Sequence, residues 1–171
     1  MERRTLLGAA AALPGTAAAA GAADARQPFF GVWRLMRYEF KTKSTGRIVH
    51  PYTEKPEGRI TYDAAGRMSA QLMRPGRKLL AGKVPQAGAA AIFELATAEE
   101  IREAAGGYIA YYGTFDVMPV EQTVVHHVKG CLIPNWVGTD LHRRYEFRSA
   151  ARLVLTADTP SAVGTLVWER E

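Results

Sequence analysis

Apolar and polar residues alternate with a period of two along most of the chain, and turn-forming residues interrupt the alternation at short intervals. Alternation enriched in aromatic and β-branched residues is typical of strands that bury one face. The Asp-Ala-Ala-Gly connection at 63–66 predicts the clearest hairpin. The pattern predicts about eight strands, over residues 31–42, 57–62, 67–73, 108–117, 122–129, 141–148, 152–157 and 165–171, and a turn at 44–46 sends the chain back from the first strand through residues 47–49.

One segment predicts a helix. Thr97 and Glu100 have the spacing of a capping box, and Gly106-Gly107 supplies a stop. A short helix over residues 98–105 follows. Residues 74–88 are rich in Pro, Gly and Lys and predict a loop.

Because only one helix is predicted, the direction of neighbouring strands in the sheet can be inferred. Parallel neighbours need long crossovers, so the sheet must be largely antiparallel. An open sheet would leave two exposed edges, whereas closure removes both. We therefore predict an all-β fold, a closed antiparallel barrel of about eight strands with one short mid-chain helix against or across its end. The loop over residues 74–88 is expected at the mouth, and a two-layer sandwich is the alternative.

Composition agrees with a single globular domain, since the 171 residues are 47% hydrophobic and 23% charged. The first 25 residues differ from the rest: Arg3-Arg4-Thr5-Leu6-Leu7 precedes an Ala-rich stretch, and Ala-Asp-Ala at 23–25 fits a cleavage site. We predict an export signal at 1–25, with the domain at 26–171 and a periplasmic or secreted location. The paired arginines resemble a twin-arginine signal, and the general secretory route is the alternative. No membrane span is expected after the signal is removed.

Charge and cysteine content narrow the function classes. Residues 1–25 contain two bases and two acids, so the remainder keeps the net charge of +5, without a run of five like charges. This predicts no nucleic-acid partner. Cys131 is the single cysteine and cannot form an internal disulfide. No phosphate loop, dinucleotide fingerprint, nucleophile elbow or metal motif is present, so no cofactor is predicted.

Several segments resemble one family. Gly31-Val32-Trp33 opens the first strand, and Trp168-Glu169-Arg170 ends the last. Segments 68–75, 107–114, 125–128, 134–139 and 143–145 are similar, in the same order, to the bacterial and fungal lipocalin-like domain family, and the resemblance covers residues 30–170. It implies a calycin-type barrel in which an arginine of a late strand lies over the tryptophan at the closed end. Gly31, Trp33 and Arg170 are accordingly structural candidates. The mid-chain helix and the lack of further lipocalin motifs depart from the best-known lipocalins.

The strand at 122–129 contains the candidate chemistry. Alternation places His126 on one face with Val124 and Val128, and His127 on the other. One histidine must therefore face inward, and both are catalytic candidates. Adjacent histidines on opposite faces cannot chelate one ion, so no metal site is predicted. Arg143 and Arg144 split between the faces in the same way. The ligand-binding candidates are Tyr62, Gln71, Tyr111, His127, Asn135, Trp136 and Arg144.

Two functions fit this pattern. The first is an exported protein that binds a small hydrophobic molecule in its barrel. The second is an isomerase or cyclase in which a lumen histidine acts as acid or base. The sequence decides neither the ligand, nor the choice between carrier and enzyme, nor the oligomeric state.

Overall fold

The structure is a computed structural model that describes residues 24–80 and 88–171. Of the predicted export signal, residues 1–25, all but the last two lie outside the described residues. Strands are β1 (Gly31–Thr42), β2 (Ile48–Val49), β3 (Glu57–Tyr62), β4 (Arg67–Met73), β5 (Tyr108–Met118), β6 (Thr123–Cys131), β7 (Asp140–Ser149), β8 (Arg152–Asp158) and β9 (Ala162–Arg170). Helical segments are α1 (Ala89–Leu95), α2 (Ala98–Gly106) and the 3-10 turns η1 (Gln27–Phe29) and η2 (Pro134–Trp136).

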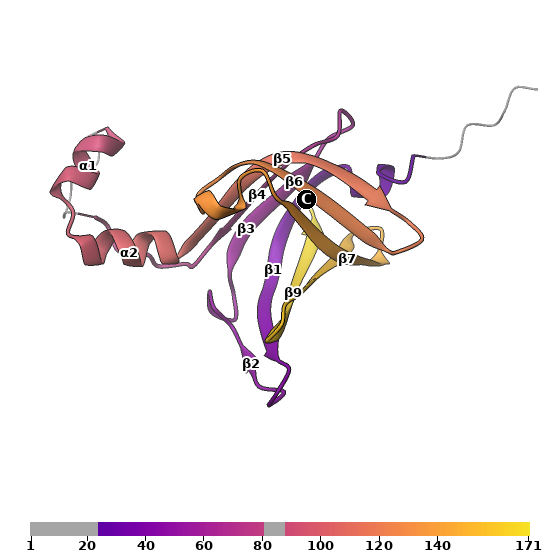
Figure 1. The fold of residues 1–171 in the computed structure, drawn as a ribbon, viewed down its shortest axis with the longest axis horizontal. Helices are drawn as coiled ribbons and strands as arrows, with labels where there is room; N and C mark the ends of the chain where they lie inside the picture. The colour runs from indigo at the N-terminus through magenta and orange to yellow at the C-terminus, as the bar shows by residue number, and fades with distance from the viewer. Residues whose placement is uncertain (1–23, 81–87) are drawn as a thin grey trace, which may run out of the picture.

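The strands form one closed antiparallel barrel (Figure 1). Strands β3 to β9 pair in sequence order, and β1 joins β3 on one side and β9 on the other. The two-residue β2 adds to β1 outside this ring of eight strands. The predicted closed barrel is confirmed, and the sandwich alternative is wrong because β1 pairs with strands on both sides.

The prediction of a single helix is wrong, since α1 precedes α2. The capping box at α2 is present: Thr97 N donates to Glu100 Oε2 over 2.7 Å, and Glu100 N donates to Thr97 Oγ1 over 3.2 Å. Because helix α1 has only seven residues and no side-chain cap, the sequence has little local pattern that would predict it. Figure 1 shows both helices to one side of the barrel, not across its end. Neither helix buries a residue.

One end of the barrel is closed by the tryptophan of β1. Trp33 is fully buried, its Nε1 donates to Phe29 O over 2.7 Å, and the Arg170 guanidinium lies 4.1 Å from its ring centroid. Gly31 has φ of 121°, and a Cβ there would lie 3.1 Å from Arg170 Nη1. Both the positive φ and the close approach of Arg170 therefore favour glycine at position 31. The 3-10 turn η1 also buries Phe29 against interior aromatic rings: Tyr62, Phe115, Tyr145 and Phe147.

At the opposite end, which we call the open end, β4 leads away toward the helices and β5 returns from them. The 3-10 turn η2 connects β6 and β7 at this same end, because Tyr111 near the start of β5 pairs with Cys131 at the end of β6. Trp136 of η2 is half-buried and packs against the interior cluster. The barrel interior is therefore bounded at the closed end by packed aromatic rings and at the other end by a rim, which consists of the segments that connect the strands.

Candidate functional site

The barrel interior is walled mainly by apolar side chains. One face of each strand turns inward, as the alternating burial along β4 and β6 shows. An eight-stranded barrel either fills this space with side chains or holds one small ligand there. The apolar lining includes Leu35, Ile60, Met68, Leu72, Phe115, Val124, Val128, Leu153, Leu155 and Leu166.

A polar group of three side chains interrupts this apolar lining. His126 is fully buried and, tyrosines aside, is the one buried polar or charged residue of the described chain. Its Nε2 lies 2.8 Å from the Tyr62 hydroxyl and its Nδ1 lies 3.0 Å from the Tyr111 hydroxyl. Both ring nitrogens of the histidine are thus engaged by phenols from β3 and β5. We call Tyr62, His126 and Tyr111 the interior triad.

All three members of the interior triad are neutral at neutral pH. Burial lowers the pKa of His126 to about 3, and the nearby charge of Arg143 acts in the same direction. Burial raises the pKa of Tyr111 to about 12 and raises the pKa of Tyr62 well above its ordinary value. The near-neutral histidine pKa expected for acid or base chemistry is therefore not found at His126.

Counting protons in the triad shows what it offers to a ligand. Two phenols and one neutral imidazole carry three acidic hydrogens, and the two internal hydrogen bonds use two of them. If Nε2 carries the imidazole proton, Tyr62 keeps a spare O–H; if Nδ1 carries it, Tyr111 does. One phenol donor is therefore left over in either tautomer, and neither tyrosine has another side-chain partner among the described residues.

Arg143 faces the same interior. Along β7 it alternates with Leu141 and Tyr145, which pack against the interior cluster, and its cross-strand neighbour is the buried Val124. Its charge lowers the pKa of His126 and offsets part of the burial effect on the pKa of Tyr62. The sequence analysis chose Arg144 as the ligand-binding arginine, and this choice is wrong, because alternation with Leu141 and Tyr145 places Arg143 on the inner face.

Trp136 brings the open end close to the triad. Its ring meets the Tyr111 ring edge-to-face, with centroids 6.1 Å apart. Half-buried Cys131 packs nearby in the interior cluster, and its Sγ accepts a hydrogen bond from Ile133 N over 3.2 Å. The indole therefore lies between the rim and the triad, where it would contact a ligand that enters from the open end.

Of the predicted ligand-binding residues, the structure brings Tyr62, Tyr111 and Trp136 together in the interior. Four others lie elsewhere. Arg144 is exposed on the outer face of β7, since its neighbours His142 and Glu146 on that face are exposed too. Asn135 is exposed on η2, and His127 and Gln71 are half-buried on the outer face. Because side chains alternate strictly across a strand, the interior positions of His126 and Arg143 exclude His127 and Arg144 from the lumen.

On the outer face, His127 joins three strands. Its Nδ1 lies 2.7 Å from Asp140 Oδ1 and its Nε2 lies 3.1 Å from Asp116 Oδ2. These hydrogen bonds, led by the one to Asp140, raise the pKa of His127. Asp116, His127 and Asp140 come from β5, β6 and β7 in turn. The histidine therefore acts as a surface clamp across neighbouring strands.

Replacing His127 by Gln is expected to destabilise the protein more at pH 5.5 than at pH 8.5. A raised native pKa means that the protonated clamp stabilises the fold below pH 6.5, and that this contribution disappears as pH rises through the native pKa. Because the pair is partly exposed, the effect should resemble that of a surface ion pair, about 0.2–1 kcal/mol. Urea unfolding at both pH values measures it, and an equal or larger loss at pH 8.5 would contradict the clamp.

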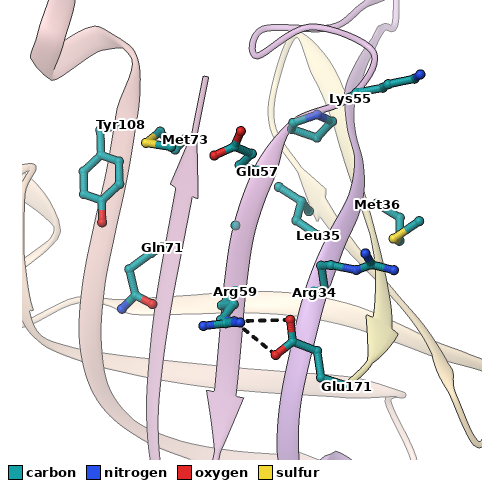
Figure 2. Close-up of a pocket in the computed structure, with 12 residues that line it drawn as sticks. Arg34, Leu35, Met36, Lys55, Glu57, Arg59, Gln71, Met73, Tyr108 and Glu171 are labelled. Atoms are coloured by element: carbon teal, nitrogen blue, oxygen red, sulfur yellow. Dashed lines mark hydrogen bonds and ion pairs between the residues drawn. The ribbon is translucent and has the colours of Figure 1, made fainter. Parts of the chain in front are cut away.

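A lateral groove of about 1000 Å³ lies on the outer side of the barrel, where β1 and β3 separate (Figure 2). The last cross-strand pair is Arg34 with Arg59, and β1 then bulges between Leu35 and Arg37. Figure 2 shows Arg59 paired with Glu171 at one side of the groove. The predicted residue Gln71 lines this groove and not the lumen.

The described residues contain neither a metal-ligand cluster nor a membrane-spanning helix. No group of three or more His, Cys, Asp or Glu side chains there is placed to hold a metal ion. Within residues 24–80 and 88–171, no helix is long and apolar enough to cross a membrane.

Comparisons with known proteins place the chain in a family. A sequence profile of the lipocalin-like domain matches residues 30–171. The 4'-hydroxy-3'-methoxypropiophenone carrier protein ppsC of Aspergillus oryzae (strain ATCC 42149 / RIB 40) is 37% identical over 82 residues, which cover 44% of this chain and 67% of that protein. A de novo designed fluorescence-activating β-barrel aligns over 88% of this chain and 100% of its own, at 12% identity and a TM-score of 0.41, a likeness too low to support an argument. The profile match extends from just before β1 to the last residue, and the chain therefore belongs to the lipocalin-like domain family.

Proposed function

We propose that the protein binds a small, mostly apolar molecule inside its barrel, with the interior triad as the polar point that orients it. The observation that carries this proposal is the spare phenol donor of Tyr62 or Tyr111 within an apolar lining. Small-molecule sites are typically apolar with a few placed polar groups. The carrier function in the name of the Aspergillus oryzae relative supports the same reading.

The energetics favour a ligand that brings an acceptor. A buried donor left without a partner costs about 1–3 kcal/mol. A ligand carbonyl or ether oxygen beside the triad would remove that cost, while its apolar body would contact the surrounding side chains. The expected ligand is therefore a ring-bearing or branched molecule with at least one acceptor oxygen.

The test compares a ketone with its hydrocarbon counterpart. N-phenyl-1-naphthylamine fluorescence reports occupancy, and 2-acetylnaphthalene and 2-ethylnaphthalene compete for the site. The ketone is expected to bind about 2–10-fold more tightly, the equivalent of one hydrogen bond. In the combined variant Tyr62→Phe, Tyr111→Phe, His126→Leu, the whole polar group becomes apolar and the ketone should lose its advantage.

The matched control changes outward-facing neighbours. Tyr112 is 61% exposed, and His127 lies on the outer face, so Tyr112→Phe with His127→Leu alters the same residue types outside the lumen. This variant should keep the ketone preference. The proposal fails if the unaltered protein gives no saturable fluorophore binding, or if the interior and exterior variants behave alike.

A second candidate function is proton-transfer catalysis. It is favoured by the contacts of both His126 ring nitrogens with phenol hydroxyls. A proton taken at one nitrogen can leave from the other, so His126 could relay protons between Tyr62 and Tyr111 without becoming charged. Deuterium incorporation from solvent at the α-carbon of 2-acetylnaphthalene, followed by NMR, tests this role. Exchange no faster than in buffer would exclude it for this ketone, and so would a rate that survives His126→Leu.

We also propose that residues 1–25 export the protein through a twin-arginine route to the periplasm or the medium. The support is the Arg3-Arg4 pair ahead of an Ala-rich stretch. Replacing both arginines by lysine keeps the charge and should abolish twin-arginine export while leaving general secretion intact. Unchanged export of that variant would assign the general secretory route, and retention of the unaltered protein in the cytoplasm would reject export.

A further inference from the structure

We infer that the barrel selects ligands that carry an anionic oxygen group, and that Arg143 neutralises that group inside the lumen. This inference rests on the proposed binding function. It adds a charge requirement to a site otherwise defined by shape and hydrogen bonding.

Arg143 lies on the inner face of the barrel wall. It is half-buried on the inward face of β7, opposite Val124 of β6. Its charge acts on the pKa of every member of the interior triad, and also on the pKa of Tyr38 of β1. Tyr38 and Tyr62 lie on the neighbouring strands β1 and β3, and Tyr111 and His126 lie on β5 and β6, so the Arg143 charge acts on groups of four strands around the interior.

The Arg143 side chain lacks a counter-ion among the described residues. The one hydrogen bond of the Arg143 side chain is from Nη1 to its neighbour's carbonyl, His142 O, over 2.9 Å, and it joins no ion pair among the described residues. Outward-facing Arg34 and Arg152, in contrast, both pair with Glu169. No Asp or Glu side chain of the described chain is buried. A partly desolvated cation without a partner is unfavourable, and a ligand anion would offset that cost.

Several hydrogen-bond donors of the interior lack an acceptor among the described residues. The triad keeps one phenol donor, Arg143 has guanidinium N–H groups to spare, and the buried Trp168 Nε1 has no acceptor among the described residues. These are all donors, and none is matched by a protein carboxylate. A carboxylate, phenolate, enolate or sulfonate supplies several acceptor lone pairs and the missing negative charge.

The experiment uses two probes with one ring system. 8-Anilinonaphthalene-1-sulfonate has the skeleton of N-phenyl-1-naphthylamine plus a sulfonate. The protein is expected to bind the sulfonate at least about tenfold more tightly than the neutral probe, as a charge-assisted hydrogen bond implies. Arg143→Met should remove this preference while leaving neutral-probe binding unchanged or stronger.

Arg144→Met is the matched control, because it removes the same charge one residue away on the outer face. It should alter neither affinity by more than about twofold, since an exposed charge is screened. Equal losses of sulfonate binding in the two variants would mean that the net charge of the protein attracts the probe. That result would overturn the inference. So would equal affinities for the two probes in the unaltered protein. If the neutral probe itself does not bind, the binding function fails and the inference with it.

Two further competitor pairs identify the acid. 2-Naphthoate against 2-naphthamide reports on carboxylates, and 4-nitrophenol against 4-nitroanisole at about pH 8.5 reports on phenolates. At least one anion should outcompete its neutral partner in an Arg143-dependent manner. Arg143-independent competition by both anions would reject the assignment.

Discussion

Replacing Trp33 by Ala is expected to lower the free energy of unfolding by about 3–5 kcal/mol. The indole is fully buried at the closed end, donates a hydrogen bond to Phe29 O and lies under the Arg170 guanidinium. Its removal leaves a cavity and also deprives Arg170 of the aromatic face on which it rests. Urea unfolding monitored by circular dichroism measures the change. A loss below about 1 kcal/mol would show that the closed end is not a centre of stability.

A second variant separates the ring from the cation. Arg170→Met keeps Trp33 buried but removes hydrogen bonds from Arg170 to Pro28 O and Ala150 O, together with the cation over the ring. This change should cost less than Trp33→Ala, about 1–3 kcal/mol, because no large cavity forms. If Arg170→Met proved the costlier change, the closed end would depend chiefly on the arginine network.

Acid is expected to destabilise the protein by about 2 kcal/mol between pH 6.5 and pH 5, through His126. The unfolded chain binds a proton at this histidine near pH 6.5, whereas the folded protein does so only near its native pKa of about 3. Protons therefore favour the unfolded state across this interval, and stability falls as pH falls. The contribution of His127 has the opposite sign and is already complete below pH 6.5.

Urea unfolding at pH 6.5, 6, 5.5 and 5 tests this effect. The variant Tyr62→Phe, Tyr111→Phe, His126→Leu should lose most of the slope without leaving unpaired phenols behind. His127→Gln should keep the slope, because His127 titrates on the outer face. A slope that persists in the triad variant would place the acid-sensitive group elsewhere.

Most strand positions could be predicted from the sequence because burial of one face is a local pattern. The bounds of β1, β3 and β4 equal those expected from alternation, and β5 and β8 extend one residue further. The capping box at Thr97 and Glu100 located α2 in the same way. Helix α1 was missed because seven residues without a cap leave too weak a pattern.

The site was only partly predictable. Tyr62, Tyr111 and Trp136 were candidates, and His126 was one of two alternatives. Gln71 and Arg144 were assigned to the ligand although alternation places both on outer faces, with Ala70 and Arg143 on the inner ones. The same strict alternation that reveals a strand could have excluded them, once one residue of each strand was known to face inward.

The sequence by itself determined that this chain forms strands with one apolar face, that these strands must be antiparallel, and that Trp33 stands at the start of the first. Only the tertiary structure decided which histidine is inside and what it touches. Tyr62 and His126 are 64 residues apart and meet through barrel closure, and Tyr111 reaches the other ring nitrogen from a third strand. Alternation specifies a face but not a partner across the lumen, because partners depend on the register of strands that are distant in sequence.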